Sequence, residues 1–101
     1  MLILPIKKKW IDMILSGEKK EEYREIKPYY KSRFATVFGE KNLSESVDEC
    51  PAKEIVFKNG YSSDNPSFVA TCRLRKGTGN PKWGAEKGKE YYILKICDIR
   101  K

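Results

Sequence analysis

The chain has 101 residues, of which 40% are hydrophobic and 35% charged, as expected of one small domain with a modest core. Histidine is absent, which excludes Ser-His and Cys-His nucleophile pairs and the commonest metal ligand. No apolar run reaches the ~20 residues of a membrane span, and the three cysteines are odd in number and widely spaced. We therefore expect a cytoplasmic protein without membrane, metal or cofactor. The net charge of +7 favours nucleic acid as the partner.

The first residues predict a strand followed by a helix. Residues 2–4 form a short apolar run that ends at Pro5, and proline is tolerated at the rim of a sheet. Residues 7–16 then place apolar side chains at spacings of three and four, the period of a helix face that packs on a core. Gly17 is a natural helix stop, because glycine enters the left-handed conformation without steric cost.

Residues 20–26 predict a second strand that carries most of a charged cluster. Alternate side chains of a strand point to opposite faces, so Glu22 and Arg24 share one face and Tyr23 points the other way. Lys19 precedes them at the turn and can reach over the same face. The sequence therefore places an ammonium, a carboxylate and a guanidinium together at one strand edge. The alternative is a surface salt-bridge set worth ~0–1 kcal/mol per pair, without meaning for function.

The remainder predicts a second helix and three further strands. The helix begins at Pro28 and ends at Gly39, and the acidic residues 39–52 are expected to form a surface loop, with or without one helical turn. The expected strands are residues 53–58, 67–76 and 89–99. Five short strands with two helices near the N-terminus predict a single α+β domain over residues 1–101. Its sheet is expected to form a small, partly closed β-barrel, because closure hides the sheet edges.

Four residues outside the charged cluster are candidate ligand contacts. Trp83 lies in a loop with glycine and lysine and would stack on a base, which supplies ~1–3 kcal/mol; it would otherwise cap the barrel. Tyr61 is a weaker aromatic candidate, with packing as the alternative. Glu86 would add a second carboxylate near the mouth of the barrel, and Arg73 would contact phosphate. A solvated loop residue and ordinary surface charge are the respective alternatives.

The chain resembles a known family through the stretch Gly17-Glu18-Lys19-Lys20-Glu21-Glu22-Tyr23-Arg24. This stretch is similar to the G-x-K-x-x-E-x-R motif of ASCH domains, members of the PUA-like barrel superfamily. The helix before it and the closing residues 83–96 are similar too, so the resemblance covers nearly the whole chain. It implies a β-barrel whose cleft is lined by the motif, and a role in binding RNA.

The same resemblance implies that an enzyme is possible. One bacterial branch of similar size hydrolyses N4-acetylcytidine with a lysine at the position of Lys19 and a threonine at that of Glu22. A glutamate cannot serve as that hydroxyl nucleophile, so this assignment does not carry over intact. Other members resemble ribonucleases that use the motif lysine.

Three functions remain open from the sequence. The first is an RNA- or nucleotide-binding module with Lys19, Glu22 and Arg24 as polar contacts. The second is a small hydrolase acting on RNA or a modified nucleoside, with Lys19 as general base and Glu22 as its partner. The third is a protein-interaction subunit in which the charged cluster only braces the barrel. Ligand identity, base preference and oligomeric state are not determined by these patterns.

Overall fold

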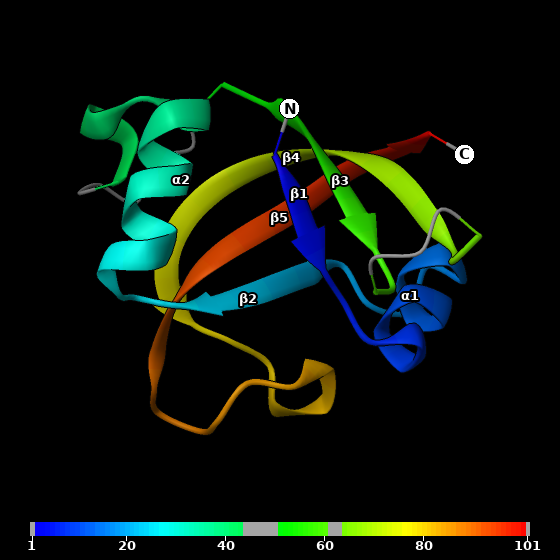
Figure 1. Cartoon of the computed structure of the whole chain (residues 1–101). Helices are drawn as coiled ribbons and strands as arrows, with labels where there is room; N and C mark the ends of the chain where they lie inside the picture. The colour runs from blue at the N-terminus through cyan, green and yellow to red at the C-terminus, as the bar shows by residue number, and fades with distance from the viewer. Residues whose placement is uncertain (1, 44–50, 61–63, 101) are drawn as a thin grey trace.

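A computed structural model describes residues 2–43, 51–60 and 64–100 of the chain. It contains two α-helices, five β-strands and two short 3-10 helices (Figure 1). In chain order these are β1 (Ile3–Pro5), α1 (Lys8–Leu15), β2 (Glu21–Glu25), α2 (Pro28–Phe38), η1 (Glu40–Leu43), β3 (Lys53–Lys58), β4 (Ser67–Thr78), η2 (Pro81–Trp83) and β5 (Glu90–Arg100).

The five strands form one mixed sheet in the order β1-β3-β4-β5-β2. The short strand β1 runs parallel to β3, and every other neighbouring pair is antiparallel. The long strands β4 and β5 curve strongly, with a register shift between Thr71 and Cys72, so the sheet bends into a half-barrel (Figure 1). The expected α+β class and the partly closed five-stranded sheet are therefore confirmed.

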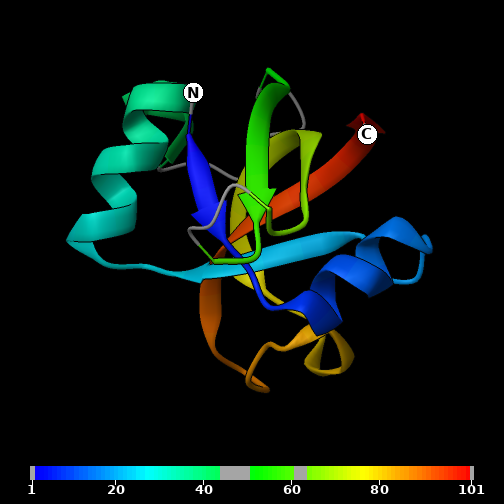
Figure 2. The ribbon, with the colours of Figure 1, turned by 45° about the vertical axis from the view of Figure 1, so that its right-hand side comes forward.

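The concave face of the half-barrel holds the main core. Leucine and aromatic side chains of β3, β4 and β5 pack there against Ile11 and Ile14 of α1 and Phe34 and Phe38 of α2. The two helices lie at opposite ends of the half-barrel (Figure 2). The helical spacing of these apolar residues explains why each helix presents one stripe to the sheet.

A second, smaller cluster lies on the other face of β2 and β5. Tyr23, Tyr91 and Ile93 pack there with Ala85 from the segment between η2 and β5, and half-buried Trp83 lies against them. Gly79 makes this close approach possible, because a Cβ at that position would lie 2.7 Å from both the Tyr23 ring and the Ala85 Cβ. The segment 79–89 is thus folded onto the sheet, where the sequence predicts a glycine- and lysine-bearing loop over residues 77–88.

Most of the boundaries expected from the sequence shift by one residue, and two differences are larger. The strand β4 continues to Thr78, two residues past the expected end, because Gly77 and Thr78 still pair with Tyr91 and Glu90. The expected acidic loop begins with η1, and its residues 44–50 lie outside the described part of the chain. None of the described helices is both long enough and apolar enough to cross a lipid bilayer.

Candidate functional site

The turn after α1 brings the three charged groups of the cluster together. Gly17 adopts a φ of 87°, and the backbone N–H of Lys19 donates to the carbonyl of Met13 at 2.9 Å. The Lys19 side chain thereby lies over the start of β2. Its Nζ is 3.5 Å from Glu22 Oε2, and Arg24 Nη1 is 2.9 Å from Glu22 Oε1. The carboxylate therefore lies between the ammonium and the guanidinium.

Lys19 is buried more deeply than the sequence indicates. Its side chain has 0% relative exposure, and its Nζ donates to the carbonyl of Trp83 at 2.5 Å. The same Nζ lies 4.5 Å from the centroid of the Trp10 ring, within cation–π range. Burial lowers the pKa of Lys19, and the attraction of Glu22 opposes this effect. Lys19 thus lies beneath the site, whereas the sequence pattern predicted that it would reach over the mouth.

Arg24 connects the two edges of the half-barrel. Its Nη1 also donates to the carbonyl of Tyr23 at 2.7 Å, and its Nη2 donates to the carbonyl of Pro5 at 2.7 Å. The N–H of Tyr23 donates to Glu22 Oε1 at 3.3 Å. Strands β1 and β2 are the outermost strands of the sheet, so these side chains occupy backbone groups that an edge strand otherwise leaves free.

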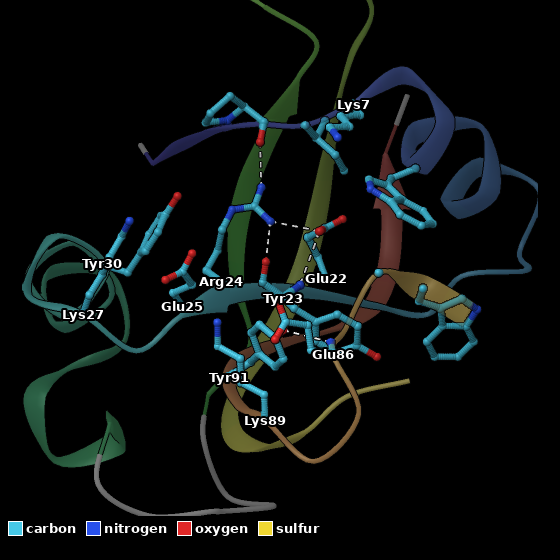
Figure 3. A pocket seen from close by; sticks show the side chains of 15 residues that line it. Lys7, Glu22, Tyr23, Arg24, Glu25, Lys27, Tyr30, Glu86, Lys89 and Tyr91 are labelled. Carbon is cyan, nitrogen blue, oxygen red and sulfur yellow. Dashed lines mark hydrogen bonds and ion pairs between the residues drawn. The ribbon is translucent and has the colours of Figure 1, made fainter. Parts of the chain in front are cut away.

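A hollow of about 360 Å³ opens between the end of β1, the starts of α1 and α2, strand β2 and the segment that leads into β5. Glu22 and Arg24 line it, with relative side-chain exposures of 7% and 11% (Figure 3). Three lysines from different parts of the chain border it: Lys7, Lys27 and Lys89, which immediately precede α1, α2 and β5. The hollow therefore combines a nearly buried ion pair with a basic margin.

Aromatic side chains complete the lining of the hollow. Tyr30, Trp83 and Tyr91 contribute from three elements, together with Trp10, whose ring also contacts the Lys19 ammonium. Trp83 packs on the smaller cluster and also borders the hollow, so its position is compatible with either alternative raised by the sequence. Its main-chain carbonyl also accepts the hydrogen bond from the Lys19 ammonium.

A hydrogen-bond chain fixes the wall formed by Tyr23. Its hydroxyl donates to Glu21 Oε1 at 2.8 Å and accepts from the backbone N–H of Asn80 at 2.9 Å. Arg75 completes the chain with an Nη2 to Glu21 Oε2 distance of 2.8 Å. Burial raises the pKa of Tyr23 well above its usual range, so the hydroxyl stays protonated and keeps donating to Glu21.

The remaining candidates from the sequence are placed differently. Glu86 borders the hollow and is exposed, and its backbone N–H donates to the Tyr91 hydroxyl at 2.9 Å. Arg73 lies exposed on β4 and is not among the residues that border the hollow. Tyr61 lies outside the described residues. No three or more acidic or cysteine side chains of the described ranges are grouped so that they could hold a metal ion.

The lysines at the margin were not among the site residues predicted from the sequence, although the lysine run 7–9 at a helix start left an anion-binding end open beside a solvated one. Lys7 and Lys27 are the N-cap residues of α1 and α2, and neither helix has a side-chain cap or an acidic residue in its first turn. Cations are unfavourable at a helix N-terminus, so each placement fits either a solvated helix end or an anion-binding one. Only the fold shows that both helices begin at the same hollow.

Comparisons with known proteins do not assign a function, so the geometry of the site is the basis for proposing one. No protein-family model matches the chain, and neither a curated protein nor a solved structure matches it.

Proposed function

We propose that the protein binds RNA or a nucleotide-like ligand in the hollow, as a member of the PUA-like ASCH domains that its sequence resembles. The observation that carries the proposal is the combination of features around one cavity. A buried carboxylate–guanidinium pair, Glu22 and Arg24, borders it, lysines surround it, and aromatic residues line it. Nucleotides present the matching groups: base edges with donors and acceptors, a π-face, and a phosphate.

The dimensions and charge of the hollow support a nucleotide-sized ligand. Its volume of about 360 Å³ lies in the range of small-molecule sites, which starts at roughly 300 Å³. Lys7 and Lys27 stand at helix N-termini, where backbone N–H groups add to the positive potential. A phosphate near this margin would relieve the repulsion between each lysine and its helix.

The hollow is less suited to a protein partner that adds a strand to the sheet. Such a partner needs free N–H and C=O groups on an edge strand. At Tyr23 both groups are occupied, by Glu22 and Arg24 respectively, and the carbonyl of Pro5 on the facing edge accepts from Arg24. These contacts favour a ligand that is recognised by side chains.

One observation favours the alternative of a small hydrolase with Lys19 as general base. Burial lowers the pKa of Lys19, which makes the neutral amine more accessible. Against this, its Nζ is bound to the carbonyl of Trp83, and Lys19 is not among the residues that border the hollow. Catalysis by Lys19 would therefore require η2 to move away from it.

Fluorescence anisotropy with short single-stranded RNA at two salt concentrations tests the proposed function. Lys27→Glu should weaken binding about tenfold and reduce its salt dependence by about one phosphate contact. Lys53→Glu is the matched control, because it changes the net charge equally at an exposed position of β3 away from the hollow.

Equal weakening by both variants would mean that only the overall charge attracts RNA, and absence of binding by the wild type would refute the proposal. The same samples are also checked for RNA cleavage products. Cleavage that disappears in Lys19→Met would establish the hydrolase alternative, and intact RNA would exclude it for that substrate.

A further inference from the structure

An exposed aromatic side chain stands beside the hollow, on the first turn of α2. Tyr29 is 53% exposed, whereas the other described aromatic side chains are buried or half-buried. Its neighbour Tyr30 borders the hollow together with Lys27 (Figure 3). The two tyrosine rings meet edge to face, with their centroids 5.0 Å apart. The lining of the hollow therefore continues onto an aromatic surface of α2.

Arg33 covers part of this surface, one helical turn further on. Its guanidinium carbon lies 3.5 Å from the centroid of the Tyr29 ring, and its Nη1 donates to the Tyr29 carbonyl at 3.1 Å. These two contacts hold the planar guanidinium against the ring. No hydrogen bond or ion pair within the described ranges engages its Nε or Nη2. Arg33 therefore keeps donors for a further acceptor.

The charge of this part of the chain suits a polyanion. Residues 26–39 carry three basic side chains and no acidic one. The buried residues of α2 are Phe34 and Phe38, so the exposed ring of Tyr29 is not needed to hold the helix on the sheet. Proteins that bind single strands combine aromatic platforms with a basic surface, and bases also stack on guanidinium planes. Tyr29 and Arg33 provide both features in one place.

We propose that a single-stranded RNA with one nucleotide in the hollow continues along α2, where its adjoining base stacks on Tyr29 and Arg33. Arg33 also donates to a phosphate of that strand. This inference rests on the proposed function and extends it from one nucleotide to a segment of at least two. The edge-to-face contact between Tyr29 and Tyr30 joins the two positions. A mononucleotide then uses only part of the site.

Competition against a fluorescent single-stranded RNA, followed by anisotropy, tests whether the site is longer than one nucleotide. The competitors are AMP and the 5′-phosphorylated oligoadenylates of two and three residues. They share one base, so they differ in length and not in base identity. The wild type should bind the trinucleotide at least about tenfold more tightly than AMP, because stacking of one further base is equivalent to roughly 5- to 150-fold.

The variant Tyr29→Ala assigns this gain to the ring. Alanine is the best helix former and the position is exposed, so the variant should fold, which circular dichroism checks. We expect the ratio of trinucleotide to AMP affinity to fall below about threefold. Tyr29→Trp restores a stacking platform and should keep the wild-type ratio.

The contribution of Arg33 is separated from overall charge by a second cation of the same helix. Arg33→Gln should lower the salt dependence of trinucleotide binding by about one phosphate contact. Lys31→Gln removes the same charge and is the matched control. Lys31 is exposed and stands two residues from both Tyr29 and Arg33, hence on another side of the helix. It should change the salt dependence much less.

The outcomes separate this inference from the proposed function. Binding of AMP and the trinucleotide with equal affinity by the wild type would overturn the extended site and leave nucleotide binding intact. A length-dependent gain that persists in a folded Tyr29→Ala variant, or equal effects of Arg33→Gln and Lys31→Gln, would also overturn it. Absence of binding to RNA and to all three competitors would instead overturn the proposed function itself.

Discussion

Removing the charge of Glu22 is predicted to destabilise the fold, because it leaves the Lys19 ammonium buried without its counter-ion. The Glu22 side chain is 7% exposed and lies 3.5 Å from Lys19 Nζ and 2.9 Å from Arg24 Nη1. Breaking a buried pair by removing one partner costs about 3–5 kcal/mol. We expect the loss of stability in Glu22→Gln to lie near the lower end of this range, because Lys19 can release its proton and become neutral. A loss of about 3 kcal/mol corresponds to a melting temperature lower by roughly 12–24 °C in a domain of this size.

A double-mutant cycle identifies the source of this cost. Glu22→Gln, Lys19→Met and the double variant are unfolded in urea and followed by circular dichroism. Because Met fills the space of the lysine stem without a charge, the double variant should be more stable than the sum of the single losses predicts, by about 2 kcal/mol. Single losses below about 1 kcal/mol that simply add would refute the reasoning, because they would mean that water already solvates the pair.

Three further predictions concern the surroundings of the site. Burial lowers the pKa of Lys19 in the folded protein below the 10.5 of the unfolded chain. As pH rises toward 10.5, Lys19 therefore keeps its proton in the unfolded state and loses it in the folded state, which makes the folded state more stable. The wild type should therefore gain stability relative to Lys19→Met between pH 7 and 10, measured by urea unfolding; a constant difference would contradict this. Tyr23→Phe removes the partner of Asn80 N–H and of Glu21, and should cost about 1–3 kcal/mol and make the 79–89 segment more sensitive to proteolysis. The lysine of Arg24→Lys cannot bridge Glu22, Tyr23 and Pro5 together, so this variant should lose about 2–3 kcal/mol of unfolding free energy in urea. An unchanged urea midpoint would show that the bridge between β1 and β2 is dispensable.

Local patterns in the sequence were sufficient for the elements and for part of the site. The apolar spacing of residues 7–16 and the glycine that follows define α1 and its end, and alternation in β2 places Glu22 and Arg24 on one face. These features depend on backbone periodicity and steric limits, which act over a few residues and are therefore readable from the chain. The convergence of Lys19 with Glu22 and Arg24 follows from the same short-range geometry.

Contacts between residues distant in the chain were decided by the tertiary structure alone. The burial of Lys19 depends on the carbonyl of Trp83, which is 64 residues away, and the hydrogen bond from Arg24 to Pro5 depends on how the half-barrel brings β1 to β2. The meeting of Lys7, Lys27 and Lys89 at one hollow has the same origin. The sequence by itself determined which residues carry charge and which strand face they share. Their depth and their neighbours were set by the curvature of β4 and β5, because long-range packing has no local signature.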